Sequence, residues 1–539
     1  MNSFRPPWTT LTAIALIALG GFLLRFSIAS SEFLWLDELH TSWSTNESLA
    51  DVAGRAADGN QTPLYFWLIW CIGSVFGQTE LSLRSLSVVA GTGSLLVASW
   101  HTWKWTSCSI ATTLVAWLVA VNVSMIYYGS EARPYAMIQL LSVIQVSLFC
   151  ESLRRLFKPS PVSKNDSQQR PWTFLWLAIV SILLINTHPT SIWLLLMEVM
   201  FVLVSRLIQR DRRSGSNEPS SVTFIDWARL VGTAMVVAVG SLPVIIQMVK
   251  MYGRSGNWQD ISSTSGLWTE IVPEALVLLG LPVAFLISRR VLSHRLGWGS
   301  PGSAIQTGHI AQQLAFTFLW AVFPIGSVIA LDFFEIAPMA LQRYTLVGAI
   351  GFPVFAGLCL GHLSGRVGKV VLAGAILVIT FVQNPLLESV AWQHRIPQFR
   401  FEDWDTPISE INASESKAHH PVFLFSNLIE DRNAFVDYDP QFQMYLLFPV
   451  NGLYRLEARG REISAGPTLE LTHFSEQQIN SIKEQGGGWV IIRGADIINE
   501  IGEEVRFRTA EKIGIPLSDV RVSVFDAGNS DVYWLSVDW

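Results

Sequence analysis

Two adjacent carboxylates, Asp37 and Glu38, follow the first long apolar run of the sequence, Trp8 to Ile28. Trp35 and Leu39 flank the pair. Because the pair follows the apolar run, it stands where the chain leaves a membrane. A charge at the bilayer centre costs roughly 2.5–3.5 kcal/mol or more, whereas a carboxylate at the rim costs little and can meet a substrate. The alternative interpretation is an acidic end to a helical hairpin.

Composition places these carboxylates in a polytopic membrane protein. The chain has 539 residues, of which 50% are hydrophobic and 15% charged, whereas soluble domains carry about 25% charged residues. Its 22 Trp and 30 Phe fit the same class. The net charge of −6 argues against nucleic acid as a partner. The first apolar run is too long for a signal-peptide core, so we interpret it as a retained anchor.

Eleven apolar runs are long enough to cross a membrane, with a range of 10 to 13 crossings, by the rule of about 20 residues per span. They lie near 8–28, 85–103, 109–127, 133–150, 172–187, 189–206, 227–249, 268–288, 311–331, 344–362 and 369–385. The shorter run Pro63–Phe76 is predicted to be a juxtamembrane helix. If it does not cross, the loops rich in Lys and Arg all fall on the cytoplasmic side, and the first outer loop spans 29–84.

The sequence predicts two parts, a transmembrane module over 1–385 and a soluble extracytoplasmic α/β domain over 386–539. Beyond Pro385 polar residues rise and no run is long enough to span. Short apolar runs there predict strands, and one polar stretch predicts a helix. The expected strands are Val422–Phe425, Trp489–Ile492, Val520–Phe525 and Val532–Val537, and the expected helix is Ser475–Glu484.

In this topology several polar residues at segment ends gather on the outer face, which is the pattern of a site. Asp37 can accept a proton from a hydroxyl nucleophile. Glu38 and Glu131 could orient a substrate or hold a divalent cation. Arg133 and Arg343 suit bidentate recognition of a phosphate. Glu131 and Arg133 could instead form a local ion pair, and Arg343 could be an interface anchor.

Three further residues belong to this expected site. His188 could ligate a metal, together with Glu38 and Glu131, or bind an anion, although His188-Pro189 could also be a tight turn between two helices. Tyr135 and Tyr344 could hydrogen-bond a phosphate or pack on a sugar. Carboxylates and arginines at a membrane rim suit group transfer from a lipid-linked phosphate donor to a hydroxyl or amine acceptor.

These features resemble the polytopic glycosyltransferases of the GT-C fold, in particular the family 39 proteins, whose relatives include the protein O-mannosyltransferases, the aminoarabinose transferases and the Rgt-type transferases. The similarity is clearest over residues 30–210. It rests on Trp35-Leu36-Asp37-Glu38, Thr62-Pro63-Leu64-Tyr65-Phe66, Leu83-Arg84-Ser85-Leu86-Ser87, Tyr128-Gly129-Ser130-Glu131-Ala132-Arg133-Pro134-Tyr135, Thr187-His188-Pro189, Arg343-Tyr344 and Glu402-Asp403-Trp404.

The resemblance implies a polyprenyl-phosphate sugar donor, an outward-facing active site in a bacterial inner membrane, and inversion at the anomeric carbon. Asp37 would be the base, with Glu38 beside it. Arg133, Arg343 and Tyr344 would face the donor phosphate, and Glu131 would assist acceptor or metal binding. Membrane lipid is a further expected partner. The acceptor could be a lipid, a glycan or a protein.

One departure from the family pattern bears on a metal. Many relatives have His-Pro-Pro where this chain has Gln61-Thr62-Pro63. A histidine role there is lost, so dependence on a divalent cation such as Mg or Mn stays open.

The main alternative is a lipid or glycolipid transporter or flippase, and a third interpretation is an outward-facing scaffold that binds a partner. Transporters often show repeated halves and polar or broken helices near the midplane. In this sequence the polar groups gather at the rim, which favours the glycosyltransferase.

Overall fold

The structure is a computed structural model of the 539-residue chain. The residues that it describes are 5–153, 166–212, 224–252, 264–296, 304–428, 444–465, 483–494, 498–526, 528 and 530–539. The chain forms two compact units. The helical unit is Met1–Ser27 with Ser85–Pro397, and the loop–sheet unit is Ile28–Arg84 with Gln398–Trp539.

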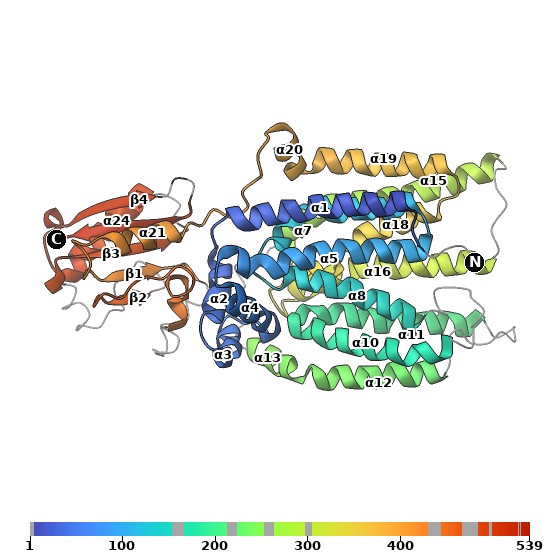
Figure 1. Cartoon of the computed structure of the whole chain (residues 1–539), viewed down its shortest axis with the longest axis horizontal. Coiled ribbons are helices and arrows are strands. Elements are labelled where there is room, and N and C mark those ends of the chain that lie inside the picture. Colours follow the sequence, from blue (N-terminus) through green and yellow to red (C-terminus); the bar gives the residue numbers. More distant parts are fainter. Residues whose placement is uncertain are drawn as a thin grey trace. The chain divides into compact units, whose positions relative to one another are not determined.

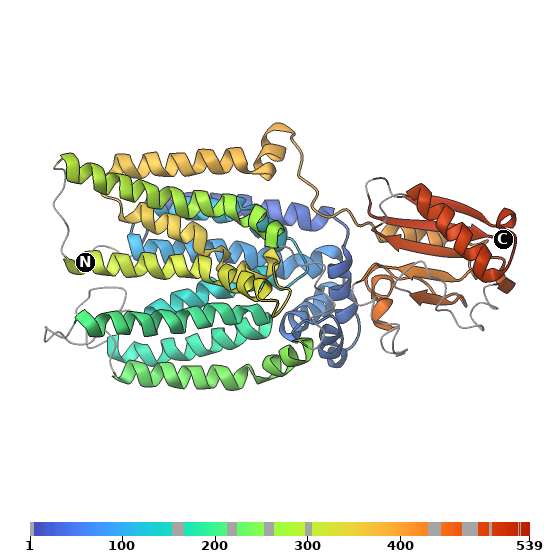
Figure 2. The same cartoon turned by 180° about the vertical axis from the view of Figure 1, so that it is seen from behind.

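Helices occupy every one of the predicted spanning runs. The axes of the long helices in the helical unit are roughly parallel to one another (Figures 1 and 2). Their bounds are α1 (Trp8–Ser31), α5 (Glu80–Thr106), α6 (Ser109–Val121), α7 (Val123–Gly129), α8 (Tyr135–Ser152), α10 (Asp166–Thr187), η1 (Pro189–Ser191), α11 (Ile192–Arg212), α12 (Phe224–Gly240), α13 (Leu242–Tyr252), α14 (Thr264–Ala275), η3 (Leu276–Gly280), α15 (Leu281–Leu296), α16 (Ala304–Phe333), η4 (Gln342–Tyr344), α17 (Leu346–Ala349), α18 (Gly351–His362), α19 (Arg366–Gln383) and α20 (Pro385–Trp392).

The apolar helices make the chain an integral membrane protein. Within the described residues, six helices are long and apolar enough to cross a membrane, or eight if each of two bent pairs is one span. Other predicted runs form shorter apolar helices, such as Leu346–His362. The number of eleven crossings therefore stays a prediction.

Small residues let some of these helices approach closely. A Cβ atom on Gly351 of α18 would lie 2.7 Å from the backbone nitrogen of Ala321 on α16. Trp320, on the same part of α16, is fully buried and donates its indole N–H to the Val347 carbonyl at 2.9 Å. Gly351 and Trp320 together fix how α16 packs on α17 and α18.

Residues 28–84 of the loop–sheet unit contain three short helices, α2 (Leu36–Thr45), α3 (Leu49–Asp58) and α4 (Pro63–Phe76). The predicted juxtamembrane helix has the same bounds as α4. Pro63 is its first residue, where the missing N–H costs nothing because that donor has no partner within a helix. Whether α4 lies along the membrane surface stays a prediction.

The C-terminal region forms a sheet with strand order β2-β1-β3-β5-β4, as far as it is described. The strands are β1 (Val422–Phe425), β2 (Ile463–Ala465), β3 (Gly487–Arg493), β4 (Arg521–Asp526) and β5 (Val532–Asp538). β1 pairs in parallel with β2 and β3, whereas β5 is antiparallel to β3 and β4. Helix α24 (Ile498–Ile513) packs against β4 and covers one face of the sheet (Figure 2).

All four predicted strands are present, and the mostly helical class with an α/β C-terminal region is confirmed. Short β2, helix α24 and helix α21 (Asp405–Ala413) were not predicted. The helix predicted over Ser475–Glu484 falls mainly on 466–482, which lie outside the described residues. The remaining short helices of this region are η6 (Phe448–Val450) and η8 (Leu517–Asp519).

Within the loop–sheet unit, the first loop packs on the C-terminal region. The His40 ring contacts the rings of Tyr445 and Phe448, with centroids 6.1 and 5.5 Å away. The backbone N–H of Leu453 donates to the Ser42 hydroxyl at 2.6 Å. The predicted division at residue 385 therefore differs from the compact units, because residues 28–84 fold with residues far along the chain.

Candidate active site

Helix α2 carries the two adjacent carboxylates Asp37 and Glu38. Trp35 is extended, with φ −85° and ψ 170°, and the helix begins at Leu36. Asp37 and Glu38 lie in the first turn, where negative charges interact favourably with the helix dipole. Asp37 is half-buried, whereas Glu38 is fully buried. The two neighbours thus lie in different environments.

Glu38 is held by Arg84, at the start of α5. The Arg84 Nε donates to Glu38 Oε1 at 2.7 Å, and Nη2 donates to Oε2. The remaining N–H groups of Arg84 donate to the backbone carbonyls of Ala29, Glu32 and Phe33, at 3.0, 2.6 and 2.8 Å. These bonds account for all the donors of a guanidinium group. Arg84 therefore ties the end of α1 to the beginning of α2.

A second buried ion pair adjoins the first. Arg400 Nη1 lies 2.7 Å from Glu32 Oε2, and Arg400 Nε lies 3.5 Å from Glu38 Oε2. The side chains of Glu38, Arg84, Arg400 and Glu32 are 0%, 0%, 1% and 4% exposed. We call these four residues the buried charge network. Its two positive and two negative charges balance, which is what makes burial of charge tolerable.

This network bears on the expected metal site. Both Glu38 oxygens accept from Arg84, so this carboxylate does not fit a cation-ligand role. Among the described residues, no three His, Cys, Asp or Glu side chains gather so that they could hold a metal ion. Of the residues predicted as ligands, Glu38 therefore does not fit a Mg or Mn site.

In the helical unit, a broken helix leads to the other predicted residues. Helices α6 and α7 meet at Asn122 with a bend of 59°. The carbonyls of Val119 and Ala120 accept from the Arg25 guanidinium at 3.1 and 3.4 Å, and that of Val121 accepts from Asn384 at 2.7 Å. Side chains thus satisfy the carbonyls that the break leaves without helical partners.

The turn after α7 contains Glu131 and Arg133, which are 0% and 4% exposed. The Arg133 backbone N–H donates to the Glu131 carbonyl at 2.8 Å. The Ser87 hydroxyl donates to the Arg133 carbonyl at 3.1 Å. Helix α5 therefore holds this turn in place directly before Tyr135 begins α8.

The predicted arginines, tyrosines and histidine of the helical unit lie together. Ring centroids are 5.1 Å apart for Tyr128 and Tyr135, 5.9 Å for Tyr135 and His188, and 5.9 Å for His188 and Tyr344. The Arg343 guanidinium carbon lies 5.3 Å from the Tyr344 ring centroid. We call Tyr128, Arg133, Tyr135, His188, Arg343 and Tyr344 the arginine–tyrosine cluster.

His188 is neutral in this cluster. Burial, followed by the charges of Arg343 and Arg133, lowers its pKa to about 3. The Thr190 backbone N–H donates to His188 Nδ1 at 3.3 Å, so Nδ1 is the acceptor and Nε2 carries the proton. His188 is also the N-cap of the 3₁₀ turn η1, so the tight turn that the sequence indicated is present as well.

The structure thus brings the predicted residues together in two groups, one in each compact unit. Arg133, Tyr135, His188, Arg343 and Tyr344 gather in the helical unit, with Glu131 in the same turn as Arg133. Asp37 and Glu38 belong to the loop–sheet unit.

Sequence reasoning gave no role to Arg25, Glu32, Arg84 or Arg400. The available signal for Arg25 was its position inside an apolar run, since an ionisable residue there needs a partner and usually has a function. Glu32 and Arg400 could not be paired from the sequence, because they are 368 positions apart.

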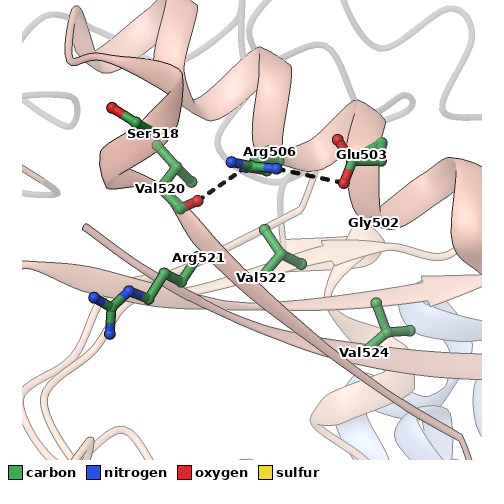
Figure 3. A pocket seen from close by; sticks show the side chains of 8 residues that line it. All are labelled: Gly502, Glu503, Arg506, Ser518, Val520, Arg521, Val522 and Val524. Atoms are coloured by element: carbon green, nitrogen blue, oxygen red, sulfur yellow. Dashed lines mark hydrogen bonds and ion pairs between the residues drawn. The ribbon is translucent and has the colours of Figure 1, made fainter.

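A separate groove of about 430 Å³ lies between α24 and β4 (Figure 3). Its Arg506 donates to the Val520 carbonyl at 3.0 Å and pairs with Glu503 at 3.5 Å. The bond to Val520 fastens α24 to the residue before β4, whereas the ion pair lies within α24. The lining contains none of the predicted site residues.

No protein-family model matches the sequence, and no curated protein matches it. Solved structures do match. ArnT from Cupriavidus metallidurans in the apo state is 12% identical, with 98% of each chain covered and a TM-score of 0.54. ArnT bound to undecaprenyl phosphate is 12% identical, with 98% of this chain and 97% of ArnT covered and a TM-score of 0.50.

An oligosaccharyltransferase from Archaeoglobus fulgidus, in complex with Zn and sulfate, is 11% identical, with 97% of this chain and 72% of that chain covered and a TM-score of 0.47. At sequence identities this low, structural similarity shows the fold alone, and the two ArnT structures provide that similarity. The chain therefore has the GT-C fold that its sequence predicted, a polytopic helical membrane protein with a C-terminal α/β region.

Proposed function

We propose that the chain is an inverting membrane glycosyltransferase that moves a sugar from a polyprenyl-phosphate-linked donor to an extracytoplasmic acceptor. The arginine–tyrosine cluster is the observation that carries the proposal. It places two arginines beside aromatic rings at the ends of apolar helices. Such a cluster suits a ligand that has both a phosphate and a sugar.

Arg133 and Arg343 would bind the donor phosphate. When the bond from the sugar C1 to the phosphate oxygen breaks, the phosphate gains a second negative charge. Two fixed guanidinium groups stabilise that charge more in the transition state than in the bound donor. Neutral His188 can add its Nε2–H as a donor, and Tyr344 lies beside Arg343. The structure of ArnT bound to undecaprenyl phosphate, which shares the fold, supports a lipid phosphate as ligand.

Asp37 would be the general base. Its carboxylate accepts the proton of the acceptor hydroxyl, whose oxygen forms a bond to C1 while polyprenyl phosphate leaves from the opposite side. Attack in one displacement inverts the anomeric carbon. A half-buried carboxylate in the first turn of α2 can meet an acceptor, whereas buried Glu38 cannot. We assign Glu38 a supporting role next to the base.

The same proposal places the protein in a bacterial inner membrane, with residues 29–84 and 386–539 on the outer side. Glu131 and Tyr135 would contribute to substrate binding. A lipid, a glycan or a protein would accept the sugar.

A transfer assay tests the proposal. Purified protein in detergent is given a panel of radiolabelled polyprenyl-phosphate sugars, with membrane extract as acceptor. Label should move from one donor, and Arg343→Ala should raise the KM for that donor on the order of 10- to 100-fold. Arg366→Ala, at an exposed arginine of α19, should leave the KM unchanged. Folded protein that moves label from no donor would contradict the proposal and favour a transporter.

A further inference from the structure

A carboxylate from the C-terminal region lies at the start of α2. The backbone N–H of Leu36 donates to Glu402 Oε2 at 2.9 Å, across a sequence separation of 366 residues. The first N–H groups of a helix have no partner within the helix, and a polar N-cap side chain usually accepts from one of them. Residue Trp35, at the N-cap of α2, makes no such side-chain bond. Glu38 Oε2 accepts from the Trp35 N–H at 3.4 Å, and Glu402 supplies the acceptor for the Leu36 N–H.

Glu402 is itself held in place. Trp404 donates its indole N–H to Glu402 Oε2 at 2.9 Å, and Arg493 Nε donates to Oε1 at 2.8 Å. The residue is 7% exposed. Its carboxylate thus accepts from α2, from its own segment and from strand β3. A displacement of this carboxylate would lose several charge-assisted hydrogen bonds at once.

The same turn of α2 is fixed on its other side. Glu38, next after Asp37, belongs to the buried charge network with Arg84 and Arg400. The backbone before Asp37 is thus bound by Glu402, and the side chain after it is bound by two arginines. Asp37 itself remains half-buried. This arrangement leaves the first turn little freedom to rotate while its acidic group stays accessible.

We infer that Glu402 is a positioning residue for Asp37, holding the first turn of α2 so that the Asp37 carboxylate keeps the direction in which it takes the acceptor proton. The inference rests on the proposed function. It gives the C-terminal region a part in catalysis, since that region supplies the acceptor for the helix that carries the base. A base misplaced by about 1 Å costs on the order of 10²-fold in rate.

Three substitutions separate positioning from charge. Glu402→Leu removes the acceptor for Leu36, Glu402→Asp keeps the charge but withdraws the carboxylate by one methylene, and Glu402→Gln keeps an acceptor oxygen without the charge. Glu402→Leu and Glu402→Asp should lower kcat on the order of 10²-fold, while the KM for the donor stays within about twofold of the wild-type value. Gln keeps the acceptor oxygen for Leu36 but places its NH2 group against Arg493, so it should lower kcat less than Leu or Asp does. Glu410→Leu, at an exposed glutamate of α21, is the matched control and should behave as wild type.

Hydrogen exchange of the peptide covering 36–45 gives a readout that needs no activity. Glu402→Leu and Glu402→Asp should speed exchange there most and Glu402→Gln less, whereas Glu410→Leu should leave it unchanged. If Glu402→Leu does not fold, Glu402→Asp decides. Wild-type kcat and exchange in a folded Asp or Leu variant would overturn the inference. If wild type transfers no sugar, the proposed function fails, and the exchange result alone decides whether Glu402 holds α2.

Discussion

At the scale of single residues, two adjacent carboxylates have different surroundings. Consecutive helical residues are about 100° apart around the axis, so Asp37 and Glu38 cannot face the same partner. The sequence showed the pair but not which member turns inward. That choice depends on Arg84 and Arg400, whose side chains close around Glu38.

We expect Glu38→Gln to destabilise the folded protein by about 3–5 kcal/mol, because it leaves Arg84 and Arg400 buried without their shared negative charge. Chemical unfolding in detergent, followed by tryptophan fluorescence, measures this change.

Glu47→Gln is the matched control for that substitution. Glu47 pairs with Arg55 at 2.7 Å, but its side chain is 59% exposed, so its loss should cost about 1 kcal/mol or less. Equal, small effects of the two substitutions would contradict the account of the buried charge network.

How much of the site the sequence could predict also depends on single residues. Arg133, Tyr135, His188, Arg343 and Tyr344 could be grouped because each ends an apolar segment on one face of the expected topology. Glu402 carried a motif resemblance but no role, since its partner Leu36 is a backbone group 366 positions away. Contacts made by folding the C-terminal region onto a loop leave no periodic signal in the sequence.

At the scale of elements, the break between α6 and α7 was hidden within one predicted run, 109–127. Its signal was Asn122, which accepts from the Met125 N–H at 2.9 Å and so begins a new helix. The carbonyls that the break exposes are bound by Arg25 and Asn384. The break sets the direction in which α7 leads to the turn with Glu131 and Arg133.

We predict that Gly129→Ala disturbs this element. A Cβ atom at Gly129 would lie 2.6 Å from Arg25 Nε, within a fully buried side chain that cannot move aside. Overpacking of this kind costs about 1–3 kcal/mol, measured as a lower midpoint of thermal unfolding.

Gly20→Ala, in α1, provides the comparison, since a Cβ atom there meets nothing within 4 Å. It should leave the midpoint unchanged or raise it slightly, because Ala favours a helix over Gly. If Gly129→Ala unfolded at the wild-type midpoint, Arg25 would not be the tightly packed support of the break.

At the scale of the whole molecule, sequence order and compact units differ. The expected boundary near 385 follows the end of the last apolar helix, α19, and composition supports it. The compact units instead join Ile28–Arg84 to Gln398–Trp539. The amino-acid composition cannot reveal which segments pack together, because residues 28–84 are held to the C-terminal region by specific pairs such as Arg400 with Glu32. The fold class was predictable because it needs only the lengths of apolar runs and the strand pattern.

A chain truncated after Pro397 should therefore lose order in residues 28–84, since Glu32 loses Arg400 and His40 loses the rings of Tyr445 and Phe448. Limited proteolysis in detergent, with cut sites mapped by mass spectrometry, measures this. New cuts should concentrate in 28–84, whereas 109–152 should stay protected as in the full chain. Equal resistance of 28–84 in both chains would show that the loop folds without the C-terminal region.

The most direct test of the central claim is the rate of sugar transfer by Asp37→Asn, measured beside Asp51→Asn, which alters an exposed aspartate at the start of α3. We expect Asp37→Asn to lose about 10²–10⁴-fold in kcat while it unfolds at the wild-type midpoint, and Asp51→Asn to transfer normally. Transfer by folded Asp37→Asn at the wild-type rate would contradict the assignment of Asp37 as the base.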